Sequence, residues 1–147
     1  MKETTESRHP ISEAREFALQ FLYQMESDKL FYFSTSHFEM FVSHFEVNGR
    51  IISHMRRVVE GVFKDLDTID DEIVKATQNW SIERMSTVDR SLLRIAVHEL
   101  LEHGTPPKVV LNEAIDLAKK FGSEQSGAFV NGILVTVAKN IGVVDLN

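Results

Sequence analysis

The chain has 147 residues, of which 43% are hydrophobic and 26% are charged, and its formal net charge is −6. This composition is typical of one globular domain, and the absence of cysteine excludes disulfides, thiolate metal ligands and a cysteine nucleophile. The acidic balance excludes binding to nucleic acid by bulk charge alone. The N-terminus lacks the apolar segment of a signal peptide and no apolar run is long enough to span a bilayer, so we expect a cytoplasmic protein without a membrane anchor.

Helical periodicity runs through the first half of the chain, where apolar residues recur at three- and four-residue spacing. We expect helices over residues 12–25, from about 36, over 50–66, and from about 68 to 80. Their starts are predicted by two capping-box pairs and one break signal, namely Ser36 with Glu39, Thr68 with Asp71, and Asn48 with Gly49.

Three more helices are predicted in the second half. Ser86 and Asp89 have capping-box spacing in front of the apolar pattern of residues 87–103. The other boundary signals are a helix stop at Gly104, a helix start at Pro106 and Pro107, a left-handed stop at Gly122, and an N-cap at Ser123. The whole pattern predicts an all-α bundle of six or seven helices, with a seam between two subdomains near residues 80–86.

Two short patterns resemble ligand-binding motifs but have the wrong spacing. In HELLEH, His98 and His103 are five residues apart, which separates them by about 140° around a helix, whereas the zinc motif H-E-x-x-H uses four. Gly122, Gly127 and Gly132 recur at every fifth residue, which matches neither a dinucleotide-binding loop nor a phosphate loop. We therefore expect that the chain is not an enzyme and carries no catalytic residue, metal or cofactor.

Three segments occur in the order and spacing of one family: AREFALQFLYQME, VDRSLLRIAVHELL and PPKVVLNEAIDLAKKFGSEQSGAFVNGIL. Over essentially its whole length, the chain resembles NusB, the family of bacterial transcription antitermination and ribosomal-RNA processing factors, in its free-standing form. The resemblance implies a single NusB-like domain of two small helical subdomains, over about 1–80 and 81–147. It also implies pairing with the ribosomal protein NusE, binding of single-stranded boxA-type RNA, and loading onto the RNA polymerase antitermination complex in ribosomal-RNA operons.

The resemblance also implies an RNA-binding face. Its residues here are Arg8 and Arg15 around the start of the first helix, and Gln125, Ser126 and Phe129 at the start of the last one. The arginine-rich run that precedes the first helix in the family reads SRHPISE in this chain. Residues 1–16 carry three cations (Lys2, Arg8, Arg15) against four carboxylates (Glu3, Glu6, Glu13, Glu16). Fewer phosphate contacts predict weaker RNA binding with a flatter salt dependence.

For the protein partner, the resemblance implies contacts at Glu16, Tyr23, Glu83 and Asp89. Acidic groups suit a basic ribosomal protein, because complementary charge speeds and orients docking. Asp89 is also a predicted capping residue, and the two roles compete for the same carboxylate. Asn112 and Glu113 belong to the family signature, and we expect them in buried hydrogen bonds between helices.

The acidic N-terminus and the net charge of −6 leave a second hypothesis open. In this alternative, the chain is a helical protein-interaction module of the same fold with little intrinsic RNA binding, and it self-associates as a homodimer when free.

Overall fold

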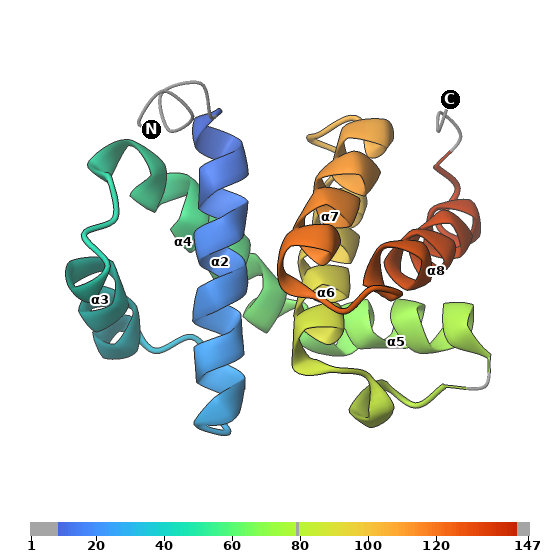
Figure 1. Cartoon of the computed structure of the whole chain (residues 1–147), viewed down its shortest axis with the longest axis horizontal. Helices are drawn as coiled ribbons and strands as arrows, with labels where there is room; N and C mark the ends of the chain where they lie inside the picture. Colours follow the sequence, from blue (N-terminus) through green and yellow to red (C-terminus); the bar gives the residue numbers. More distant parts are fainter. Residues whose placement is uncertain (1–8, 79, 144–147) are drawn as a thin grey trace.

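The part of the chain that the structure describes is mainly helical. The computed structural model describes residues 9–78 and 80–143, which form seven α-helices and one short 3-10 turn, without a strand (Figure 1). In chain order these are α2 (Pro10–Ser27), α3 (Thr35–His44), α4 (Gly49–Lys64), α5 (Leu66–Thr77), the 3-10 turn (Ile82–Arg84), α6 (Thr87–Glu102), α7 (Pro107–Phe121) and α8 (Ser126–Asn140). The all-α prediction is confirmed. None of the helices in these two ranges is long and apolar enough to cross a membrane.

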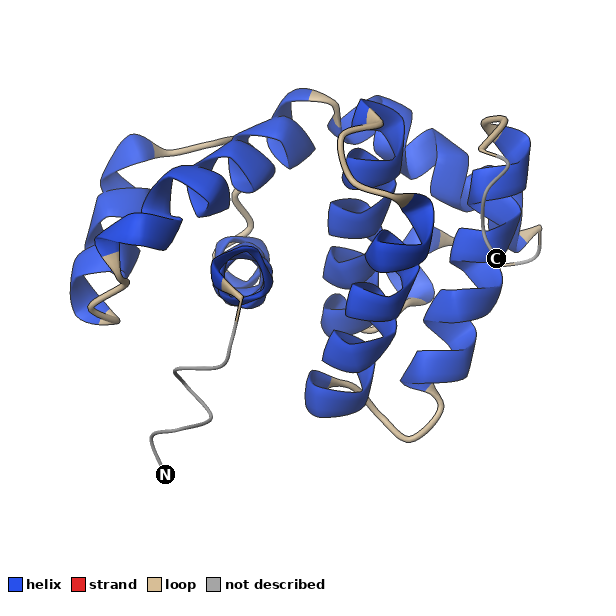
Figure 2. Cartoon of the chain, turned by 90° about the horizontal axis from the view of Figure 1, so that it is seen from above, coloured by secondary structure: helices blue, strands red, loops and turns tan. Residues whose placement is uncertain are grey.

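The helices pack as two groups that meet along α2 and α6. Figure 1 shows α2, α3 and α4 on one side and α5 to α8 on the other, and Figure 2 looks along α2, which lies beside the second group. Helix α5 packs mainly against α6 and α8, with few contacts to α4. A division near residue 80 would separate α5 from these neighbours. We therefore propose that the two subdomains divide at the α4–α5 junction, around Asp65.

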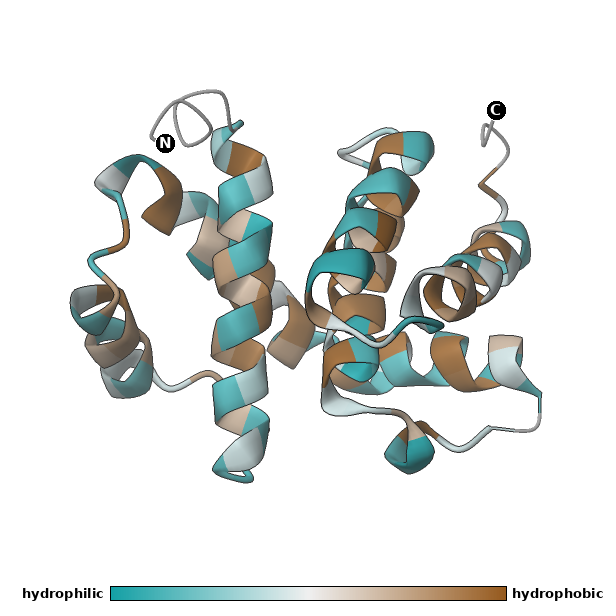
Figure 3. Cartoon of the chain, viewed as in Figure 1, coloured by the Kyte–Doolittle hydropathy of each residue, from teal (hydrophilic) through white to brown (hydrophobic). Residues whose placement is uncertain are grey.

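Helix α6 is the centre of the core. It contacts α2, α4, α5, α7 and α8, and ten of its residues are buried. A helix that is covered on nearly every side belongs to the interior, whereas α2 and α7 carry alternating apolar and polar bands (Figure 3). Gly61 of α4 packs directly against α6, where a Cβ atom would overlap the buried imidazole ring of His98.

Three predicted helix starts are confirmed. The side chain of Asn48 accepts a hydrogen bond from the N–H of Arg50 at 2.8 Å, and α4 begins directly after it. The Ser86 hydroxyl accepts from the N–H of Asp89 at 3.1 Å, so this half of the capping box is present. Helix α7 begins at Pro107, which needs no N–H in the first turn.

Two other predicted starts are wrong. The cap of α3 is Ser34, whose hydroxyl accepts from the N–H of His37, so the helix already includes Ser36. Helix α5 begins before Thr68, because α4 runs almost directly into α5 with Asp65 as the residue between them. No loop is left there for Thr68 to cap.

Two predictions about helix ends are also wrong. Gly122 has φ −97° and ψ −166°, which is extended and not left-handed, because the chain continues in an extended hinge after α7. Helix α8 begins at Ser126, so Ser123 lies within the hinge and is not the N-cap. At the end of α6, the left-handed residue is His103, with φ 60°, and Gly104 follows it.

Candidate nucleic-acid and partner interface

Arg15 lies in the interior, where three helices meet. Its guanidinium donates two hydrogen bonds of 2.7 Å to the carboxylate of Glu99 on α6, and a third of 3.1 Å to Glu113 on α7. The residue is only 5% exposed. Burial by itself would lower the pKa of Arg15, but the hydrogen bonds and charges of Glu99 and Glu113 outweigh it and raise the pKa above its ordinary value.

These contacts remove Arg15 from the expected RNA face, because its guanidinium is buried and its charge is already paired with two carboxylates. The expectation for Glu113 is confirmed, since it bonds between helices, whereas Asn112 is exposed and its expected buried role is wrong. Arg8, the other expected arginine, lies outside the described residues.

The hinge between α7 and α8 is held by Ser126. This residue is 1% exposed, and its hydroxyl accepts a hydrogen bond of 2.9 Å from the N–H of Ser123. The two serine hydroxyls also lie 3.2 Å apart, within hydrogen-bond distance. The expected phosphate contact of Ser126 therefore conflicts with its place in the structure, because its hydroxyl is buried and already bonded within the hinge. Gln125, the residue before it, is exposed.

Phe129 lies one turn after Gln125 on α8, so both side chains project from the same side of the helix. Its ring is half-buried against the core and meets Trp80 edge-on, with ring centroids 5.7 Å apart. Trp80 stands outside the three family-like segments, in the connection between α5 and the 3-10 turn, and 51% of it is exposed. Sequence reasoning missed this residue, although it is the single tryptophan of the chain.

On α2, the two expected partner contacts are separated. The Glu16 carboxylate accepts hydrogen bonds of 3.0 and 3.1 Å from Lys120 in the last turn of α7, next to the hinge. Tyr23 lies almost two turns further along α2 and is 47% exposed. Glu16 therefore belongs beside the α7–α8 hinge, whereas Tyr23 lies towards the other end of α2.

The other two expected partner contacts flank the start of α6. Glu83 is exposed on the 3-10 turn, while Asp89 is half-buried in the first turn of α6. One Asp89 carboxylate oxygen is buried without a hydrogen-bond partner among the described residues. A buried carboxylate oxygen without a donor is costly, and this oxygen is covered by the chain itself.

Arg90 fixes the turn that carries Glu83. Its guanidinium donates to the carbonyl oxygens of Ile82 at 3.0 Å and Met85 at 2.6 Å, and it also pairs with the carboxylate of Glu26 on α2. Because Glu26 lies one helical turn after Tyr23, Arg90 joins the Tyr23 end of α2 to the turn before α6. The structure thus gathers three of the four expected partner contacts near one junction: Tyr23, Glu83 and Asp89.

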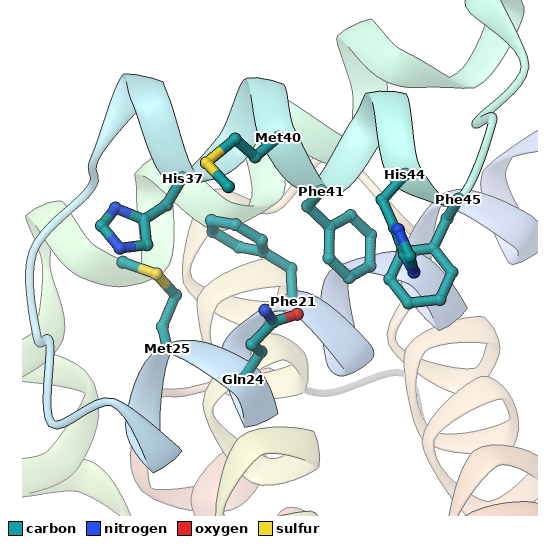
Figure 4. A pocket seen from close by; sticks show the side chains of 8 residues that line it. All are labelled: Phe21, Gln24, Met25, His37, Met40, Phe41, His44 and Phe45. Atoms are coloured by element: carbon teal, nitrogen blue, oxygen red, sulfur yellow. The ribbon is translucent and has the colours of Figure 1, made fainter.

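A cavity of about 290 Å³ opens between α2 and α3. Its lining is mainly aromatic and methionine side chains with two histidines, and Figure 4 shows the α2 side chains facing those of α3; the residues are Phe21, Gln24, Met25, His37, Met40, Phe41, His44 and Phe45. Within the described part of the chain, no three His, Cys, Asp or Glu side chains are placed to hold a metal ion.

Comparison with known proteins identifies the family. The sequence matches the model of the NusB family over residues 12–139. The chain belongs to the NusB family. The transcription antitermination protein NusB of Anaeromyxobacter sp. (strain Fw109-5) is 45% identical to it, over 87% of this chain and 89% of that protein.

Two solved NusB structures share the fold. NusB of T. maritima is 34% identical, with a TM-score of 0.77 over 90% of this chain and 92% of that one. The second is a chain from the crystal structure of the antitermination factors NusB and NusE in complex with dsRNA, which is 28% identical, with a TM-score of 0.78 over 88% of this chain and 96% of that one. The expectation of a non-enzyme agrees with membership of a family of transcription antitermination proteins.

Proposed function

We propose that this NusB-family chain is an RNA-binding transcription antitermination factor that pairs with the ribosomal protein NusE and binds boxA-type RNA. It acts in the cytoplasm on nascent RNA, within the RNA polymerase antitermination complex, and supports transcription of ribosomal-RNA operons. The observation that carries this proposal is the match, over nearly the whole of both chains, to the structure of NusB with NusE and dsRNA.

The RNA face proposed here is smaller than the resemblance implies. It consists of Gln125, whose exposed amide can pair with a base edge, and Phe129, whose ring can stack on an unpaired base. Arg8 remains a proposed phosphate contact on the basis of the sequence. Arg15 and Ser126 do not belong to this face but hold its elements in place. Arg15 links α2 to α6, and Ser126 fixes the hinge before α8.

The partner face proposed for NusE consists of Tyr23, Glu83 and Asp89. A half-exposed phenol beside carboxylates provides a large contact surface, a hydroxyl and a charge complementary to a basic protein. Glu16 already pairs with Lys120, so we leave it out of this surface.

The burial of Arg15 is the observation that favours the alternative function, because it removes a cation from the surface of a chain that is already acidic. In the alternative, the chain is a protein-interaction module that binds RNA weakly and self-associates. The two functions differ in whether NusE together with this chain binds RNA more tightly than NusE alone.

A titration of labelled boxA-type RNA distinguishes them. The RNA is titrated with this chain, with NusE, and with both, at several salt concentrations, and a scrambled RNA of the same length serves as the control. We expect the mixture to bind boxA at least about tenfold more tightly than NusE alone, a coupling of about 1.4 kcal/mol. Equal affinity of NusE alone and of the mixture would rule out the RNA-binding function and leave the interaction module.

A further inference from the structure

Trp80 is unusually exposed for a tryptophan, and packing within the described residues does not explain why a ring of this size stands at the surface. Half of this large aromatic side chain faces solvent, although tryptophan is strongly buried on average. Its one ring partner among the described residues is Phe129, which it meets at an interplanar angle of 68°. The two rings come from segments almost fifty residues apart, so only the tertiary structure brings them together.

The backbone of Trp80 is held in place. The hydroxyl of Thr77, at the end of α5, donates to the carbonyl oxygen of Trp80 at 2.9 Å and lies 3.0 Å from that of Val74. The edge-on contact with Phe129 then holds the indole against α8. A ring that is held in place before binding loses little conformational entropy when a ligand stacks on it.

Trp80 is continuous with the proposed RNA face. Phe129 belongs to the proposed RNA face and also contacts the Trp80 ring. Gln125 lies one turn before Phe129, on the same side of α8. Two aromatic rings and an exposed amide therefore lie together at the start of this helix, and such a set of side chains stacks on and pairs with the bases of single-stranded RNA.

We infer that Trp80 is a further RNA-binding residue, and that it forms with Phe129 a two-ring platform on which an unpaired base stacks. This inference rests on the proposed function and extends it to a residue outside the family-like segments. Trp80 provides the more exposed ring, while Phe129 supports it from the core side.

Because Trp80 is the single tryptophan, its emission reports on this site without a label. The titration uses the full chain with a NusE in which any tryptophan is replaced by phenylalanine. Labelled boxA-type RNA gives binding from its anisotropy, and indole emission is followed in the same sample. The variants are Trp80→Ala, Trp80→Phe and the matched control Tyr32→Ala, which removes another exposed aromatic ring from the α2–α3 connection. Thermal unfolding of each variant checks that it folds.

We expect RNA to quench Trp80 emission along the same curve as the anisotropy. Trp80→Ala should weaken RNA binding about 5- to 150-fold, as the loss of one stacked base does, Trp80→Phe should retain part of it, and Tyr32→Ala should leave it unchanged. If RNA binds without altering the emission and Trp80→Ala binds normally, the inference is wrong while the proposed function stands. A change of emission caused by NusE, with none added by RNA, would instead assign Trp80 to the protein interface and overturn the inference. If RNA does not bind the mixture more tightly than NusE alone, the proposed function fails, and this inference fails with it.

Discussion

Arg15 and Glu99 form a bidentate ion pair in the interior of the protein, with two N–O distances of 2.7 Å. The pair joins α2 to α6, and Glu113 extends it to α7. An arginine that the family resemblance placed on an RNA-binding face thus links three helices in the interior. Its sequence position suggested a phosphate contact, but its burial assigns it to the fold.

Replacement of Arg15 by alanine should destabilise the protein by about 3–5 kcal/mol, because Glu99 would remain buried without its partner. The measurement is urea unfolding at neutral pH. Lys75→Ala is the control, since Lys75 pairs with Glu72 on the surface of α5, where such pairs contribute about 0.2–1 kcal/mol. Equal decreases in the free energy of unfolding of the two variants would contradict the conclusion that the buried Arg15 ion pair stabilises the fold.

A methyl group at Gly61 should force α4 and α6 apart. The Cβ of Gly61→Ala would overlap the imidazole of His98, which is 4% exposed and has little room to move, so we expect a loss of about 1–3 kcal/mol. Gly132→Ala is the control: it adds a Cβ to an open site on α8 and should stabilise the helix by about 0.5–1 kcal/mol. If the predicted overlap is the cause, His98→Ala should recover part of the loss in the double variant.

The hinge should be sensitive to a side chain at Gly122 for a steric reason. Its φ of −97° suits any residue, but an added Cβ would overlap the Ser126 side chain and lie 2.8 Å from the carbonyl oxygen of Ala118. Gly122→Ala should therefore lower the free energy of unfolding by about 1–3 kcal/mol in denaturant titrations. Gly127→Ala, whose Cβ would make ordinary contacts of 3.6 Å or more, should not. Wild-type stability in Gly122→Ala would show that the hinge tolerates the side chain.

The two tyrosines of the chain provide a matched test of the partner face. Tyr23 and Tyr32 are 47% and 58% exposed, but only Tyr23 lies in the proposed NusE surface. Tyr23→Ala should weaken NusE binding at least about tenfold, a loss of about 1.4 kcal/mol, while Tyr32→Ala should bind normally. Isothermal titration calorimetry measures both. A similar loss in both variants would point to a general effect on the fold, and no loss in either would exclude Tyr23 from the surface.

Local patterns in the sequence determined the fold class and most helix positions. Periodicity and capping depend on residues three or four apart, which is why the start of α6 at Ser86 and that of α7 at Pro107 could be predicted. Because such patterns involve only nearby residues, they also led to the wrong predicted starts of α3 and α5. Several serines and threonines precede α3, and Ser34 is the one that caps it, whereas α5 has no side-chain cap because it follows α4 almost directly. The family could also be assigned from sequence, because its motifs are contiguous segments.

Burial and long-range pairing were decided by the tertiary structure alone. Arg15 and Glu99 are 84 residues apart, and nothing local to Arg15 distinguishes a buried arginine from an exposed one. Ser126 likewise has the sequence context of an exposed helix start, yet its hydroxyl closes the hinge. Trp80 lies beside Phe129 only because α5 packs against α8. A sequence specifies which groups are present, but whether a given group faces water, a carboxylate or another ring depends on which helices the hydrophobic core draws together.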